Sequence, residues 1–230
     1  MERAFPSPPD FDRVARWYPW AEKVCAGGLM ARARRAFLGE TAQARSLLLI
    51  GEGPGRFLND LLRSGCPARI TVVDSSERML ARARRVCHRA GRRVDSVTWV
   101  RGDVREVDLP KRCFDGVVTH FFLDCLEERE LTRLVSRVRD CAMPGALWAV
   151  TDFRIPSGPM ACPGRALIFL LYAAFRTATG LETRRLVDPD PMITEAGWKR
   201  AARRCFAAGL LRSDLYRLAS PGGDSGSDLQ

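Results

Sequence analysis

"LLLIGEGPGRF", residues 47–57, joins four consecutive aliphatic residues to three glycines spaced two apart. A short apolar run that ends in glycines predicts a buried strand followed by a tight turn. Glycines at such a turn let the backbone bend sharply and approach a ligand, because no Cβ stands in the way. The stretch therefore predicts a strand over residues 46–50 and a binding loop at Gly51, Gly53 and Gly55.

Apolar runs and stretches with helical periodicity alternate downstream of this loop. Helices are expected over residues 55–64, 77–90 and 128–141, and further strands over residues 69–74, 97–103, 114–122 and 146–153. Upstream, residues 13–38 are expected to be helical with an interruption near Pro19 and near the Gly27–Gly28 pair. Alternation at this spacing indicates parallel strands joined by right-handed helical crossovers. The sequence therefore predicts an α/β fold with a doubly wound, mostly parallel sheet, whose ligand lies beyond the carboxyl ends of the strands.

The chain divides into one expected domain and two polar or proline-rich ends. A single domain is predicted over residues 10–218, because 230 residues suffice for one well-buried α/β unit with a small addition. Disordered tails are expected over residues 1–9 and 219–230, which are rich in Pro, Gly and Ser. An insertion over residues 157–186 contains the apolar run "ALIFLLYAAF" and is not required by the sheet alone.

Charge and cysteine content narrow the class of protein. The net charge is +10, but all of the 37 basic residues except Lys23, Lys111 and Lys199 are arginine, which indicates a general arginine bias. Solvated helix faces therefore explain the basic clusters better than a nucleic-acid surface does, although the second interpretation stays open. Eight scattered cysteines without a CxxC pair predict neither a metal site nor disulfides. No signal peptide or bilayer-spanning run is found, so a cytoplasmic location is expected.

Asp74 ends the second expected strand about 20 residues after the glycine loop, a position suited to hydrogen bonds with ribose hydroxyls. Two ligands compete, a dinucleotide and an adenosyl compound without phosphates. The dinucleotide fingerprint would need glycine where Arg56 stands, and Glu52 in the loop would repel a pyrophosphate. S-adenosylmethionine has no phosphate and carries a sulfonium cation, so the loop favours it.

Four segments in order resemble the class I S-adenosylmethionine-dependent methyltransferases. They are "LLLIGEGPGR", "VVDSSERMLARAR", "VRGDV" and "FDGVVTHFFLDCL". The resemblance implies a Rossmann-like methyltransferase fold with S-adenosyl-L-methionine as cofactor. It implies that Asp74 binds ribose, that Asp103 and Val104 face adenine, and that His120 to Phe122 lie near the methionine end. The full set of implied cofactor-binding residues is Tyr18, Gly51, Glu52, Gly53, Gly55, Asp74, Ser75, Met79, Asp103, Val104, Thr119, His120 and Phe121.

The chain departs from the family pattern at Leu49, because many relatives carry an acid two residues before the first glycine. The methionine amino group would then contact backbone carbonyls or Glu52. A glycine-rich turn that binds nothing, with Ser75 or Ser76 capping the next helix beside Asp74, is the alternative interpretation of these residues. That alternative leaves the order and spacing of the four segments unexplained.

The N-terminal "FDRVARWYPW" is similar in layout to the start of ubiquinone/menaquinone-type methyltransferases, as is the region after the fifth strand. The insertion, with arginines around its apolar helix, is either a buried core helix or a lid over a lipophilic acceptor, and the same character suits peripheral contact with a membrane. A small, lipophilic methyl acceptor is therefore expected. An RNA methyltransferase and a non-catalytic S-adenosylmethionine-binding protein are the alternatives.

Methyl transfer needs a base only if the acceptor must lose a proton, because the sulfonium is already activated. The candidates at the strand ends are His120, Asp124 and Asp152. His120 can act as a base near neutral pH, or it can be a packed, hydrogen-bonded histidine. Asp124 can equally be a helix cap.

Overall fold

The computed structural model describes residues 27–89, 97–156, 158, 161–162, 164–166, 168–169 and 186–220. The strands are β1 (Ser46–Ile50), β2 (Arg69–Asp74), β3 (Val97–Arg101), β4 (Phe114–His120), β5 (Ala142–Phe153), β6 (Trp198–Phe206) and β7 (Leu211–Leu218). The helices are α3 (Gly27–Arg34), α4 (Leu38–Thr41), α5 (Arg56–Arg63), α6 (Glu77–Arg89), α7 (Glu128–Cys141) and α9 (Asp190–Glu195), with 3₁₀ turns η2 (Leu123–Cys125) and η4 (Ala207–Gly209).

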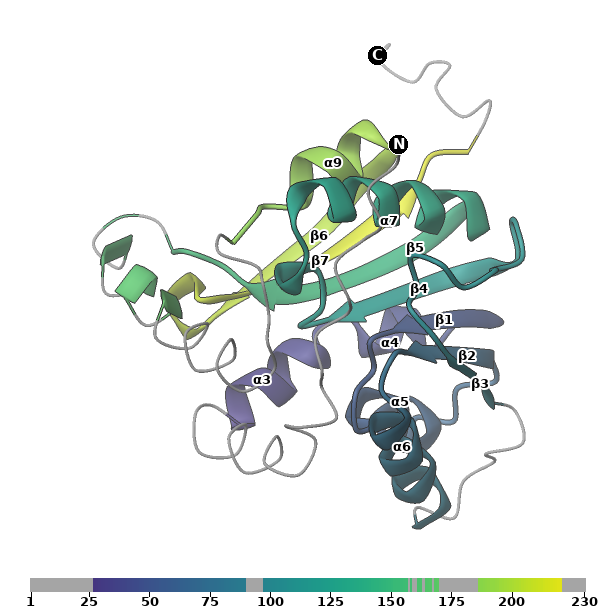
Figure 1. Ribbon diagram of the computed structural model, residues 1–230. Helices are drawn as coiled ribbons and strands as arrows, with labels where there is room; N and C mark the ends of the chain where they lie inside the picture. The colour runs from purple at the N-terminus through teal and green to yellow at the C-terminus, as the bar shows by residue number, and fades with distance from the viewer. Residues whose placement is uncertain are drawn as a thin grey trace, which may run out of the picture.

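These strands form one sheet in the order β3-β2-β1-β4-β5-β7-β6 (Figure 1). The pairs from β3 to β5 are parallel, and β7 is antiparallel to both β5 and β6. The order reverses between β1 and β4, which is the switch point of a doubly wound sheet. The predicted mostly parallel α/β fold is confirmed.

Helices cover both faces of the sheet, with α7 and α9 on one side and α4, α5 and α6 on the other (Figure 1). The packing of strand β1 on both faces of the sheet explains why its sequence has four consecutive apolar residues. Leu48 and Ile50 pack in the cluster with α7 and α9, while Leu47 and Leu49 pack in the cluster with α5. A parallel strand buried on both faces reads as a continuous apolar run.

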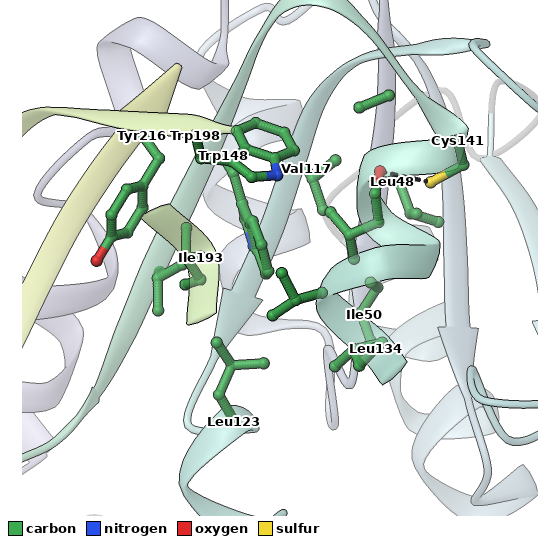
Figure 2. Packing of buried hydrophobic residues seen from close by; sticks show 14 of the residues in the cluster. Leu48, Ile50, Val117, Leu123, Leu134, Cys141, Trp148, Ile193, Trp198 and Tyr216 are labelled. Atoms are coloured by element: carbon green, nitrogen blue, oxygen red, sulfur yellow. Dashed lines mark hydrogen bonds between the residues drawn. The ribbon is translucent and has the colours of Figure 1, made fainter. Parts of the chain in front are cut away.

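At the far end of the sheet, the cluster that contains Leu48 and Ile50 becomes aromatic. Figure 2 shows Trp148 of β5 and Trp198 of β6, whose ring centroids lie 5.3 Å apart, near Ile193 of α9. Both rings are at most 1% exposed. Burial of aromatic area at this scale anchors the antiparallel strands to the parallel part of the sheet.

Most predicted boundaries agree with the structure, and the differences have local causes. Strand β4 ends at His120, two residues earlier than predicted, because Phe121 adopts a φ of 54° that a strand cannot continue. Strand β5 begins at Ala142 and not at residue 146, and its register against β4 shifts between Phe114 and Gly116. Residues 13–26, most of the insertion and the predicted tail over residues 1–9 lie outside the described residues.

Candidate active site

A pocket opens at the carboxyl edge of the sheet, beside the switch point between β1 and β4. Its lining comes from the segments that follow β1, β2, β3 and β4, together with α3 and the start of α6. The predicted residues among its lining are Gly51, Glu52, Gly53, Asp74, Ser75, Met79, Asp103, Val104, His120 and Phe121. Residues distant in sequence thus meet where the fold predicts a ligand. Tyr18 lies outside the described residues.

Two loop glycines have separate steric roles. Gly51 has a φ of +64°, and a Cβ built on it would lie 2.3 Å from Cδ2 of Phe122. Gly55 has a φ of +83°, and its Cβ would lie 2.7 Å from Cα of Ala83. Gly51 therefore admits the ring of Phe122 to the pocket, whereas Gly55 lets α5 pack closely against α6. Gly55, which was predicted as a cofactor contact, lies outside the pocket lining.

Asp74 ties the glycine loop to the turn between β2 and α6. Its Oδ2 accepts a hydrogen bond from the N–H of Gly53 at 3.0 Å, and its Oδ1 accepts one from Ser76 at 2.9 Å. The hydroxyl of Ser76 in turn accepts the N–H of Met79 at 3.1 Å and caps α6. The carboxylate is 8% exposed and lines the pocket. The capping predicted for Ser75 or Ser76 thus falls to Ser76 and coexists with a pocket-facing Asp74.

Glu52 lies under the loop and supplies a cap that Gly55 has no side chain to provide. Its Oε1 accepts the N–H of Leu58 at 2.9 Å, in the first turn of α5. Burial raises the pKa of Glu52 to about 7, against the opposing effects of this backbone bond and the nearby charge of Arg34. The side chain is therefore a half-buried carboxyl group that titrates near neutrality inside the pocket.

Asp103, after β3, is held by an arginine that sequence reasoning missed. Arg105 donates from its backbone N–H and from Nε to Oδ1 of Asp103, both at 2.9 Å, and pairs with Glu130 of α7. Partial burial raises the pKa of Asp103, but the hydrogen bonds and charge of Arg105 outweigh it, so the pKa is lowered. The carboxylate is thus fixed and ionised at the β3 end of the pocket.

His120 lines the pocket at the end of β4 and packs edge-on against Phe57, with ring centroids 4.5 Å apart. Burial, and then the charge of Arg34, lower its pKa to about 3. Its Nδ1 has no hydrogen-bond partner among the described residues. The imidazole is neutral at physiological pH, and the expectation of a base that titrates near 6.5 does not match this environment.

Thr119, Asp124 and Asp152 lie behind the pocket, outside its lining. The hydroxyl of Thr119 accepts Nε1–H of Trp148 at 3.1 Å in the core. Oδ1 of Asp152 accepts the N–H of Phe122 at 2.9 Å, and burial together with the neighbouring charge of Asp124 raises the pKa of Asp152 well above its usual range. Asp124 and Asp152, the two acids predicted as candidate bases at the strand ends, are only 1–3% exposed, and Asp152 holds the backbone of the loop after β4.

Arg34 and Phe122 also line the pocket. Phe122 was expected near the methionine end, whereas Arg34 was not predicted from the sequence. Arg34 is 8% exposed, and its guanidinium lies 5.2 Å from the ring centroid of Phe121. It stands in the basic run "ARARRAF", where nothing in the pattern separates a pocket residue from its solvated neighbours. The apolar residues after the fourth strand were the available signal for Phe122.

Known proteins are similar to this chain in sequence and in fold. Residues 47–145 match the family model described as a methyltransferase domain. The chain is 33% identical over 161 residues to a phosphatidylethanolamine N-methyltransferase of Cereibacter sphaeroides, covering 69% of this chain and 77% of that one. It is 28% identical over 155 residues to the ubiquinone/menaquinone biosynthesis C-methyltransferase UbiE of Paracoccus denitrificans, covering 65% of this chain and 60% of that one.

A solved structure shows the same fold. The 1,6-didemethyltoxoflavin-N1-methyltransferase of Burkholderia thailandensis, crystallised with S-adenosylhomocysteine, superposes with a TM-score of 0.66 at 16% identity, covering 95% of this chain and 94% of that one. The chain therefore belongs to the class I S-adenosylmethionine-dependent methyltransferases. Within the described part of the chain, the helices are too short or too polar to cross a bilayer.

Proposed function

We propose that this methyltransferase transfers a methyl group to a small, lipophilic acceptor bound on the β4 side of the pocket. The observation that carries the proposal is the apolar wall there, which Phe121, Phe122 and Leu126 form. Phe121 also joins a small apolar cluster with Phe153 at a centroid distance of 5.3 Å, and this cluster continues to Met30 of α3. An apolar wall gains free energy by covering apolar ligand surface.

The β1 to β3 side of the pocket suits S-adenosylmethionine. Gly53 has open space where a Cβ would stand, and the acids Asp74 and Asp103 are fixed at the ends of β2 and β3. In this proposal Asp74 holds the ribose, and Asp103 with the backbone of Val104 holds the adenine. Ser75 and Met79 lie along the adenosine, and Gly51, Glu52, His120 and Phe121 face the methionine end.

The bound cofactor supplies an activated methyl group on its sulfonium, so the chain has to provide placement and exclusion of water. Phe121 is held in a left-handed conformation by the bond from its N–H to the carbonyl of Thr151 at 2.6 Å. The carboxylate of Asp152 accepts a hydrogen bond from the N–H of Phe122, the next residue. The neutral His120 can accept a hydrogen bond from the methyl acceptor, and its lowered pKa makes it a weak base. An acceptor that needs little help to lose its proton fits this site.

Two further observations support a lipid-like acceptor. By name, the curated relatives act on phosphatidylethanolamine and in ubiquinone/menaquinone biosynthesis. Large apolar side chains are also exposed on this chain, at Leu29 (38%), Ile155 (39%) and Phe169 (65%). Exposed apolar groups of this kind suit contact with a membrane surface that delivers the acceptor.

The test offers methyl-labelled S-adenosylmethionine together with vesicles of phosphatidylethanolamine, a demethylated quinone, or a fractionated cell extract. Label is expected in the organic-soluble fraction. Label confined to RNA or to small polar compounds would contradict the proposal, and absence of label with intact cofactor binding would indicate a non-catalytic protein.

A variant pair locates the acceptor. Phe121→Asn keeps a residue that tolerates positive φ and removes the ring, so acceptor turnover measured at saturating cofactor should fall at least about 10-fold. Phe153→Leu removes a ring from the same cluster outside the pocket lining and serves as the control for packing. Equal losses in both variants would assign the effect to packing and not to the acceptor.

A further inference from the structure

The position where many class I methyltransferases carry an acid is apolar in this chain. Leu49 is fully buried in β1 and packs in the cluster with Leu58 and Leu61 of α5. It therefore offers neither charge nor a surface to the pocket. Any group that recognises the amino-acid end of the cofactor through charge must come from elsewhere in the fold.

The pocket carries two opposite charges, Arg34 and Glu52, at the end formed by β1 and β4. The charge of Arg34 lowers the pKa of both Glu52 and His120, so Arg34 lies close enough to act on each of them at this end of the pocket. The backbone beside Arg34 and the carboxyl group of Glu52 are both held by hydrogen bonds. The carbonyl of Ala33, next to Arg34, accepts the hydroxyl of Ser213 at 2.9 Å, and Glu52 is bonded to the first turn of α5.

The order of the strands sets the direction of the ligand. The pocket crosses the ends of β3, β2, β1 and β4 in that spatial order. If adenosine lies over β3 and β2, at Asp103 and Asp74, the methionine part extends over β1 and β4. That part is a zwitterion with one carboxylate and one ammonium group. Arg34 and Arg56 both line the pocket, and Arg34 is the arginine whose charge acts on Glu52 and on His120.

We propose that Arg34 and Glu52 form a clamp for this zwitterion, in which the guanidinium of Arg34 binds the cofactor's carboxylate and the carboxylate of Glu52 binds its ammonium group. Guanidinium and carboxylate pair through charge-assisted, often bidentate, hydrogen bonds. The inference rests on the proposed placement of adenosine in the pocket. Glu52 thus takes over a role that position 49 cannot fill, and Arg34 gives the N-terminal region a direct part in cofactor binding.

The clamp also predicts that cofactor affinity depends on pH. An ammonium group favours ionised Glu52, so affinity should rise as pH rises through neutrality and level off above it. The other groups near Glu52 are Arg34 of α3, Asp74 of β2 and Cys87 of α6, with Arg56 and His120 in the same pocket. Of these, only Glu52 has a pKa shifted into the range near 7.

The experiment measures binding of three ligands by calorimetry, without acceptor. S-adenosylhomocysteine has the whole zwitterion, its decarboxylated analogue keeps only the amine, and 5′-methylthioadenosine lacks both groups. Arg34→Gln should weaken S-adenosylhomocysteine about 10- to 100-fold and leave the other two nearly unchanged. Glu52→Gln, whose amide oxygen can still accept the N–H of Leu58, should weaken both amine-containing ligands and remove the pH dependence.

Two matched variants control for general effects. Arg35→Gln removes the neighbouring arginine, which is exposed and pairs with Asp60 outside the pocket. Glu127→Gln changes the capping acid of α7, also outside the pocket. Both should bind all three ligands like the wild type.

The outcomes separate the clamp from the placement on which it rests. If Arg34→Gln and Glu52→Gln weaken 5′-methylthioadenosine as much as S-adenosylhomocysteine, or weaken neither, the clamp is wrong. If the wild type fails to bind 5′-methylthioadenosine while Asp74→Ala binds S-adenosylhomocysteine normally, the adenosine placement is wrong and the clamp falls with it. The nature of the acceptor does not enter these measurements.

Discussion

The carboxylates of Asp74 and Glu52 at the pocket and that of Asp214 in the antiparallel half of the sheet have different kinds of partner. In the pocket half, Asp74 and Glu52 accept bonds from backbone N–H groups of the loop and of α5. In the antiparallel half, Asp214 of β7 is 2% exposed and pairs with Arg203 at 2.6 Å and with Arg212 at 2.8 Å. Backbone bonds position the first two carboxylates at a ligand site, whereas side-chain cations neutralise the third inside the fold. We propose that the carboxylates of Asp74 and Glu52 serve ligand binding, whereas that of Asp214 stabilises the fold.

The first prediction concerns the ion pairs of the antiparallel half. Asp214→Ala removes the carboxylate between Arg203 and Arg212, so the free energy of unfolding should fall by about 3 kcal/mol, the lower end of the range for buried pairs because Arg203 is partly exposed. Urea denaturation measures this loss. At temperatures where the variant is folded, its affinity for S-adenosylhomocysteine should equal that of the wild type.

A surface ion pair in the same region serves as the comparison for the stability loss in Asp214→Ala. Arg200→Gln breaks a pair with Asp190 in which the arginine is 38% exposed, so the loss should stay below about 1 kcal/mol. Equal losses in the two variants would mean that burial of Asp214 contributes nothing special. Loss of cofactor binding in folded Asp214→Ala would remove the proposed separation between the halves.

The second prediction breaks the pocket half. Asp74→Ala should weaken S-adenosylhomocysteine by about 1–3 kcal/mol, because the ribose hydroxyls lose a partner and the N–H of Gly53 loses its acceptor. In thermal shift experiments S-adenosylmethionine and S-adenosylhomocysteine should raise the melting temperature of the wild type, and NAD should not. Stabilisation by NAD of equal size would contradict the adenosyl interpretation of the glycine loop.

This difference between the halves also explains what the sequence could predict. Strands β1 and β2 and helix α7 have the predicted bounds, because continuous apolar runs and helical periodicity are local signals. Asp74 and Asp103 were predictable as acids at strand ends. Arg34 and Arg105 were not, because their roles depend on contacts with residues far away in the chain, and many other arginines have the same local pattern. The antiparallel pairing of β6 and β7 depends on such distant contacts as well.

The third prediction concerns His120, whose folded-state pKa of about 3 lies below the ordinary value of 6.5. A lowered pKa means that the unfolded chain binds a proton more readily, so the contribution of His120 to stability is present above pH 6.5 and is lost as pH falls. The free energy of unfolding should therefore fall below pH 6.5, by at most about 1.4 kcal/mol per pH unit from this group. His120→Asn should remove that part of the slope, and an unchanged slope would show that the imidazole is not held neutral.

The last prediction concerns Glu52, whose pKa is shifted in the opposite direction, from 4.5 to about 7. Its contribution is present below pH 4.5 and is lost as pH rises to about 7, because ionisation costs more in the pocket than in the unfolded chain. The difference in unfolding free energy between wild type and Glu52→Gln should fall across this window and stay constant above it. Saturating S-adenosylhomocysteine should flatten the difference, since a bound ammonium group favours the ionised carboxylate and returns the pKa toward its ordinary value. Saturating 5′-methylthioadenosine, which has no ammonium group, should leave the difference as steep as in the free protein. A curve flattened equally by both ligands would mean that occupancy of the pocket, and not the ammonium group, changes the titration of Glu52.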